Sequence, residues 1–211
     1  MKMFDDKSFD VFNIEGLEAR MVGIREVIQP IFNELDTYFV DELSSEVGEV
    51  LPIHIAQHRR RTANAPDFTW SAMGGDKRGY KKYPHFQLGI TPEYALMWLS
   101  FIDNPEFEVD MAELMLENLA WFTQLPSEMM INTDHTKNNY HSLEKEQLVK
   151  DLTRFKTVKK GEFQIGRVLT REKLVKLSQD EAREYMLETY KSLVPIYLAC
   201  MSLRQANTSK S

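Results

Sequence analysis

The sequence predicts an α+β protein with a mainly antiparallel sheet packed with N-terminal, middle and C-terminal helices. Helical periodicity marks both ends of the chain, and short β-prone runs joined by tight turns occupy residues 50–102. No regular alternation of strand and helix occurs, which argues against a parallel sheet. We expect one α+β domain over residues 1–205 and a disordered polar tail over 206–211.

The first helical region is expected between residues 17 and 48. Apolar residues recur at helical spacing over 17–28 and 31–43, with Pro30 between the two runs and Gly48 after them. The region is therefore either a broken helical hairpin or one kinked helix. Ser8 has no acid or amide three residues later, so no capping box marks a helix start there.

Strands are expected after Gly48. Two β-prone runs at 50–55 and 68–73 are followed by the best hairpin of the chain, in which 85–90 joins 94–102 through a short turn. The first arm of this hairpin alternates apolar and polar residues. The second arm is apolar on both faces, as is typical of a central strand covered on both sides.

The remaining chain mixes both kinds of element. The patterns predict a helix over 111–122, a short strand at 129–132, a helix over 142–155, a strand at 163–169, a turn capped by Thr170 and a long helix from Asp180 that Pro195 kinks.

Composition narrows the class of protein. The chain has 211 residues and a net charge of −6, with 43% hydrophobic and 27% charged residues, which is ordinary for a globular protein. Cys200 is the only cysteine and lies in an apolar stretch, so we expect a buried, inert thiol and a reducing compartment. The acidic start and the lack of a long apolar run predict a cytoplasmic protein with no membrane partner.

The conspicuous chemistry lies in the basic segment from His54 to His85. Residues 58–82 contain seven Lys or Arg against two Asp, so this stretch carries +5 and the rest of the chain −11. A second basic run occupies 154–160. Together the two runs would attract phosphates or carboxylates, whereas separately they would only balance acidic helices. The candidate ligand-binding residues are His58, Arg60, Arg61, Trp70, Arg78, Tyr80, Lys81, Lys82, His85, Lys156, Lys159 and Lys160.

Histidines are the candidate acid–base groups. His85 or His135 would act as general acid or base, with Asp134 orienting an imidazole. No His-Glu-x-x-His pattern occurs, so we predict no metal site and no cofactor. Gly74, Gly75 and Gly79 match neither the P-loop nor the dinucleotide spacing, and a tight turn is the better interpretation.

Several separated stretches resemble the YktB-like proteins of Gram-positive bacteria. The resemblance covers residues 9–169 and is carried by the stretches 9–21, 58–61, 77–81, 84–89, 134–137 and 156–160. It implies a small cytosolic protein with an α+β fold. It implies neither a reaction nor catalytic residues.

The sequence leaves three functions open. The first is binding of an anionic small molecule or of nucleic acid through the basic segments. The second is an enzyme that acts on an anionic substrate, and the third is a non-catalytic interaction module. The oligomeric state is open as well.

Overall fold

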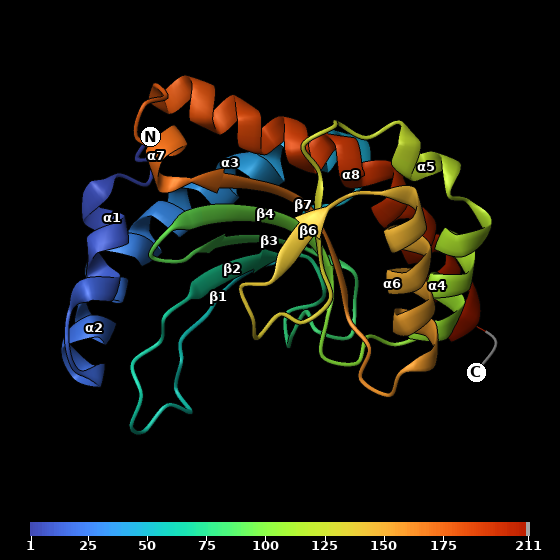
Figure 1. Ribbon diagram of the computed structural model, residues 1–211, viewed down its shortest axis with the longest axis horizontal. Helices are drawn as coiled ribbons and strands as arrows, with labels where there is room; N and C mark the ends of the chain where they lie inside the picture. Colours follow the sequence, from blue (N-terminus) through green and yellow to red (C-terminus); the bar gives the residue numbers. More distant parts are fainter. Residues whose placement is uncertain (210–211) are drawn as a thin grey trace. The chain divides into compact units, whose positions relative to one another are not determined.

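The computed structural model describes residues 1–209 (Figure 1). Their contacts divide the chain into two compact units. Unit 1 comprises Met1–Met73, Gln87–Met97 and Val168–Glu188, and unit 2 comprises Gly74–Phe86, Trp98–Arg167 and the residues from Thr189 onward.

Helices come first along the chain, four strands follow, and the remaining chain mixes both kinds of element, as expected for an α+β protein. The helical elements are α1 (Asp6–Asp10), η1 (Val11–Asn13), α2 (Leu17–Gly23), η2 (Ile24–Ile28), α3 (Gln29–Val47), α4 (Glu108–Glu117), α5 (Ala120–Thr123), α6 (Lys145–Thr157), α7 (Arg171–Leu174) and α8 (Gln179–Thr208). The strands are β1 (Ile53–Ile55), β2 (Thr69–Met73), β3 (His85–Ile90), β4 (Tyr94–Phe101), β5 (Met130–Asn132), β6 (Tyr140–Ser142) and β7 (Phe163–Thr170).

Within residues 1–209 the strands form a seven-stranded sheet in the order β1-β2-β3-β4-β7-β5-β6. The pairs β1–β2, β5–β6 and β5–β7 are antiparallel. The predicted α+β class with a mainly antiparallel sheet is therefore confirmed. Every residue of β4 is buried, as its apolar sequence predicts, and every residue of β3 is buried as well, which its alternating sequence does not reveal.

In unit 1, α2, η2 and α3 form the kinked helix rather than the hairpin. Residues 24–28 make a wider π-helical turn, and Pro30 follows in the first turn of α3. A proline has no N–H to donate, so the first turn of a helix tolerates it well. The helix ends at Gly48, whose φ of 82° places it in the left-handed region that glycine adopts without strain.

The beginning of unit 1 holds a helix that the sequence patterns did not predict. Asp5 is the N-cap of α1, and its carboxylate accepts a hydrogen bond from the Ser8 N–H at 3.1 Å. The Ser8 hydroxyl completes a capping box by accepting from the Asp5 N–H at 3.3 Å. Serine therefore occupies the position at which a capping box usually has an acid or an amide, and this is why the motif was missed.

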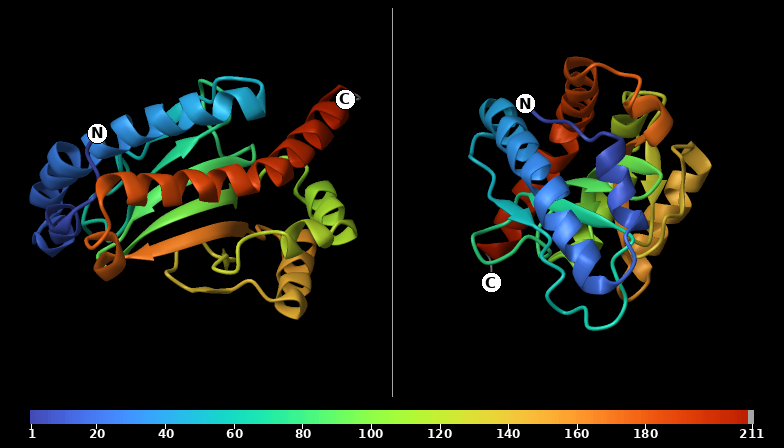
Figure 2. Two further views of the ribbon diagram at one scale, coloured as in Figure 1. Left: turned by 90° about the horizontal axis from the view of Figure 1, so that it is seen from above. Right: turned by 90° about the vertical axis from the view of Figure 1, so that its left-hand side faces the viewer.

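Helix α3 packs on β1 and β2, as Figures 1 and 2 show from different directions. Its buried face includes Phe32, Leu35 and Phe39, each fully buried. The strands pair in a register that sets Ile55 opposite Ser71. This layer also buries Asp36, a carboxyl group on the inner face of α3.

In unit 2, α4 and α6 lie side by side (Figure 1). The aromatic rings of Phe101, Phe155 and Phe163 meet with centroid separations of 5.9 to 6.3 Å and form part of the core. The helix predicted over 111–122 is two helices, α4 and α5. Asn118 interrupts them with a φ of −123°, and its side-chain amide donates to the Leu114 carbonyl at 2.8 Å.

Two further boundaries differ from the prediction. Residues 140–142 form β6 against β5, so α6 begins at Lys145 rather than at 142. Helix α8 includes Pro195 and continues to Thr208, into the tail where we expected disorder. Asn207 anchors this last part through Asp110 at 3.3 Å, and residues 210–211 lie outside the described residues.

Candidate functional site

The candidate residues fall into both units. Unit 1 contains His58, Arg60, Arg61 and Trp70, and unit 2 contains Arg78, Tyr80, Lys81, Lys82, His85, Asp134, His135, Lys156, Lys159 and Lys160. The boundary between the units lies between Met73 and Gly74, within the basic segment itself.

In unit 1, His58 supports the local structure. Its Nε2 lies 2.9 Å from the Thr69 hydroxyl, and its ring meets the Trp70 ring edge-on at 5.4 Å. Trp70 in turn stacks on Phe68 at 5.1 Å. Burial, and after it the charge of Arg61, lowers the pKa of His58 to about 4. His58 is therefore neutral near pH 7 and adds no positive charge for an anion.

Arg60 and Arg61 are exposed in the loop after β1. The Arg61 guanidinium donates to the carbonyls of Asn64 and Ala65 at 3.2 and 3.4 Å and so holds the loop. Within residues 1–209, neither arginine forms an ion pair with a carboxylate. Their charges therefore face water.

In unit 2, the glycine-rich stretch forms the tight turn that the sequence predicts. Asp76 and Gly79 exchange backbone hydrogen bonds of 2.9 and 3.2 Å. Gly75 has a φ of 77°, and a Cβ there would lie 2.4 Å from the Gly79 carbonyl oxygen, so glycine is required. The Asp76 carboxylate accepts from the N–H of Arg78 at 2.7 Å and from the Tyr83 hydroxyl at 2.9 Å. These bonds, with that from Arg78 the strongest influence, lower the pKa of Asp76.

The same turn borders a hollow of about 410 Å³, which we call the turn pocket. Its lining is Asp76 together with residues 78–83. Three cations belong to it. Lys81 pairs with Asp103, and Lys82 lies 3.3 Å from Glu106. Arg78 is exposed and, among residues 1–209, has no carboxylate partner for its guanidinium.

The turn pocket is supported by packing among the side chains of Arg204, Tyr83, Tyr80 and His85. The Arg204 guanidinium lies 3.9 Å from the centroid of the Tyr83 ring and pairs with Glu106. His85 is fully buried, and its Nδ1 lies 2.9 Å from the Tyr83 carbonyl. The Tyr80 ring packs edge-on against His85 at 4.7 Å. His85 is thus a packing residue of this turn rather than an exposed base.

A second cluster gathers around Glu162, the residue before β7. Its carboxylate lies 2.7 Å from Nδ1 of His135 and accepts the backbone N–H groups of His135 at 2.9 Å and of Asp103 at 3.1 Å. Burial favours the neutral form of Glu162, but these hydrogen bonds and the nearby imidazole outweigh it and lower its pKa. An ionised Glu162 accepts a hydrogen bond from Nδ1, which leaves Nε2 as the other reactive nitrogen of His135.

Charges from both basic runs act on Asp103. The hydrogen bond from Lys81 is the main cause that lowers the pKa of Asp103, and the charges of His135 and Lys160 act in the same direction. Lys81 of the first run contacts Asp103, whereas Lys160 of the second run acts on it through its charge alone. Lys159 and Lys160 are exposed, whereas Lys156 pairs with Glu113 at 2.8 Å.

Asp134 has a different role from the one expected. Its carboxylate accepts from the N–H and the hydroxyl of Thr136 at 3.0 and 2.5 Å and pairs with Lys137 at 3.1 Å. The hydroxyl of Thr136 is the main cause that lowers the pKa of Asp134 to about 2. Glu162, not Asp134, contacts the ring of His135.

Four residues of these clusters, Glu162, Asp103, Glu106 and Arg204, were not predicted from the sequence. Each is isolated in sequence from the side chains that it contacts. Asp103 lies in a stretch whose pattern indicates only a turn, and no spacing rule links residue 162 to residue 135. No signal in one sequence identifies such partners.

The described residues contain no cluster of metal ligands, no helix that could span a membrane and no reactive cysteine. Among residues 1–209, no three His, Cys, Asp or Glu side chains gather as a metal site. Over the same residues, no helix is both long and apolar enough to cross a membrane. Cys200 is fully buried, and burial raises the pKa of its thiol to about 12, as expected for an inert thiol.

Comparison with known proteins shows what the chain is similar to. The family model described as a domain of unknown function (DUF1054) matches residues 4–197. A UPF0637 protein of Enterococcus faecalis is 51% identical over 197 residues, which cover 93% of this chain and 97% of that protein. UPF0637 proteins of Lactococcus lactis subsp. cremoris and Listeria monocytogenes are 42% and 38% identical, over 95% of this chain and over 100% and 98% of their own lengths. These matches confirm the family resemblance that the sequence motifs indicate.

Proposed function

The chain belongs to the DUF1054 (UPF0637) family, and from its own side chains we propose that it binds a small phosphate-bearing anion in the turn pocket. One observation carries the proposal: Arg78, Lys81 and Lys82 line the same hollow as the rings of Tyr80 and Tyr83. Phosphate oxygens accept strong hydrogen bonds from guanidinium and ammonium groups. Aromatic rings can stack on the base of a nucleotide.

Arg78 is the principal ligand in this proposal. Its guanidinium has no carboxylate partner within residues 1–209, so its fork of donors is available to two phosphate oxygens at once. Lys81 and Lys82 form ion pairs with Asp103 and Glu106. They would bind the anion after it replaced these carboxylates. Lys160 would add positive potential from the second basic run.

A small ligand fits this surface better than nucleic acid. The carboxylates of Asp76, Asp103 and Glu106 are interspersed with the cations, and they would repel a long phosphate backbone. The net charge of −6 acts in the same direction at long range. A volume of about 410 Å³ is within the range typical of small-molecule pockets.

Isothermal titration calorimetry with inorganic phosphate, ADP, ATP and a single-stranded oligonucleotide tests the proposal. We expect the nucleotides to bind, and Arg78→Gln to weaken them roughly tenfold, because a charge-assisted bond is worth about 1.5 kcal/mol or more. Lys77→Gln is the matched control: it removes the same charge from a neighbour that does not line the pocket. Equal losses in the two variants, or no binding of any phosphate compound, would reject the proposal. Preferential binding of the oligonucleotide with a steep salt dependence would replace it with a nucleic-acid interface.

A second candidate function rests on the pair of His135 and Glu162. The 2.7 Å contact between Glu162 and Nδ1 is the arrangement that orients an imidazole for proton transfer, and the His135 side chain is 24% exposed. We propose His135 as the general acid or base if the chain acts on a phosphorylated substrate. A screen of phosphoesters tests this. Activity that survives in His135→Gln, or that responds to Glu162→Gln without a change in its pH profile, would reject the assignment.

A further inference from the structure

A hollow of about 290 Å³ in unit 2 lies apart in sequence from the turn pocket, and we call it the leucine pocket. Helix α5, the segment after it and the start of α6 form its walls. Its apolar lining consists of Leu119, Phe122, Leu125, Pro126, Leu143 and Leu148. An engineered apolar cavity of about half this volume, about 150 Å³, accommodates benzene. The leucine pocket is therefore large enough for an aliphatic chain with more carbon atoms than benzene.

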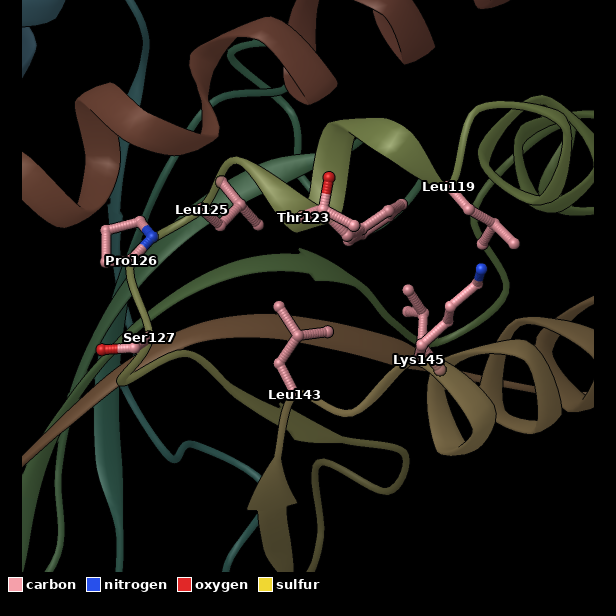
Figure 3. Close-up of a pocket in the computed structure, with 9 residues that line it drawn as sticks. Leu119, Thr123, Leu125, Pro126, Ser127, Leu143 and Lys145 are labelled. Atoms are coloured by element: carbon pink, nitrogen blue, oxygen red, sulfur yellow. The ribbon is translucent and has the colours of Figure 1, made fainter.

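Figure 3 shows how the lining is arranged. Leu125 and Leu143 point toward one another across the hollow. Pro126 and Ser127 lie at one end, and the side chain of Lys145 extends beside Leu119 at the other end. The hollow is thus elongated, with apolar walls along its length and one ammonium group at its end.

Lys145 is the charged group of this lining. Within residues 1–209, it has neither an ion pair nor a hydrogen-bond partner for its ammonium group. It is the first residue of α6, and the Glu144 side chain makes no capping bond to that helix. The amide groups of the first turn add positive potential beside the exposed Lys145, and the neighbouring acidic side chains of Glu144 and Glu146 add negative potential.

The hydroxyl groups of the lining do not supply a competing polar centre. The Thr123 hydroxyl donates to the Ala120 carbonyl at 2.9 Å, so it is already engaged by its own helix. Ser127 is exposed and lies at the opposite end from Lys145. Charge is therefore concentrated at one end of the hollow.

From this charge complementarity we propose that the leucine pocket binds a medium-chain fatty acid. The aliphatic chain would lie between Leu125 and Leu143, and its carboxylate would pair with the Lys145 ammonium. A neutral amphiphile would leave the ammonium without a counter-ion, and an amine would be repelled by it. The proposal is independent of anion binding in the turn pocket, because it uses none of the same residues.

Calorimetric titration with octanoate, octanol and octylamine tests the inference, since these probes share a chain length and differ in the charge of the head. We expect octanoate to bind about tenfold more tightly than octanol, and octylamine to bind least. Extending the series from hexanoate to octanoate should raise affinity roughly fourfold for each added CH₂, as for burial of apolar surface. Equal affinity for octanoate and octanol would overturn the proposal, as would no binding of either.

Two variants separate the role of the charge from that of the fold. Lys145→Met keeps the apolar stem and should lower octanoate affinity about tenfold while leaving octanol unchanged. Lys150→Met, at an exposed position of α6 that does not line the pocket, is the matched control and should change neither. A similar loss in both variants would overturn the assignment of Lys145.

Leu143→Trp tests the pocket itself, because Leu143 is half-buried and projects into the hollow. Filling the space should abolish binding of octanoate, with helical content checked by circular dichroism. Octanoate binding that persists in a folded Leu143→Trp protein would overturn the location. Stronger binding of an apolar peptide with a free C-terminus than of any fatty acid would overturn the ligand class and identify a peptide groove.

Discussion

Replacement of Asp36 by Asn should remove a loss of folding stability that the core of unit 1 suffers as the pH rises. Asp36 is fully buried on the inner face of α3, where that helix packs on β1 and β2. Within residues 1–209, neither of its carboxyl oxygens has a well-formed hydrogen bond, and the Ser71 hydroxyl supports it only weakly. Burial is the main cause that raises the pKa of Asp36 from 3.8 to about 7.

The direction of the effect follows from proton linkage. Below pH 3.8 the carboxyl is protonated in both the folded and the unfolded chain. Between pH 3.8 and about 7 the unfolded chain releases the proton while the folded chain retains it, so the free energy of unfolding falls as the pH rises. A pKa difference of roughly three, at 1.36 kcal/mol for each pKa unit, makes the full loss about 4 kcal/mol above pH 7.

Urea unfolding of wild type and Asp36→Asn between pH 4 and pH 8 measures this effect. The two proteins should have similar stability near pH 4, and the variant should be more stable by up to about 4 kcal/mol at pH 8. Asp41→Asn, on the exposed face of the same helix, is the control and should show no such trend. A difference between Asp36→Asn and wild type that is the same at both ends of the pH range would refute the reasoning.

Three other changes have expected outcomes that follow from local geometry. Gly75→Ala should lower the free energy of unfolding by about 1–3 kcal/mol. Gly79→Ala is the control and should change it by less, because the added Cβ would enter open space. Chemical denaturation of the two variants measures the difference. Asp5→Ala should cost about 1 kcal/mol by removing the cap of α1, and a thermal melt that shows no difference from Lys7→Ala would contradict the capping role. The Cys200 thiol should react with a disulfide reagent only after denaturant is added, and rapid labelling of the native protein would show that it is not buried.

The local pattern of the sequence predicted much of the fold. Periodicity identified the helical region ending at Gly48, without deciding between a kinked helix and a helical hairpin. It also identified the hairpin of β3 and β4, because the apolar spacing of these elements reflects their own burial. Strand β6 was missed, since it forms only by pairing with β5 and its three residues carry no strand pattern. The cap of α1 was missed because serine replaced the expected acid in the capping box.

The candidate site was predicted less completely, for a related reason. Sequence charge identified Arg78, Lys81 and Lys82, and the tight turn that presents them was expected from its glycines. Their counter-ions Asp103 and Glu106 come from a distant part of the chain, and charge counting along the sequence cannot assign them. His58 was among the predicted ligand-binding residues. Its burial beside Trp70 moves its pKa to about 4.

The carboxylates of Asp103 and Glu106 also determine how selective the turn pocket can be. Each carboxylate pairs with a lysine ammonium group that an incoming anion would need, so the proposed binding would exchange an internal counter-ion for an external one. The binding free energy of a monovalent ion such as chloride would be small, because it would replace the single negative charge of a tethered carboxylate with a single negative charge from solution. In the proposed binding mode, an anion with two negative charges on one group would replace both carboxylates at once. These partly exposed ion pairs would therefore favour multiply charged ligands over monovalent ions.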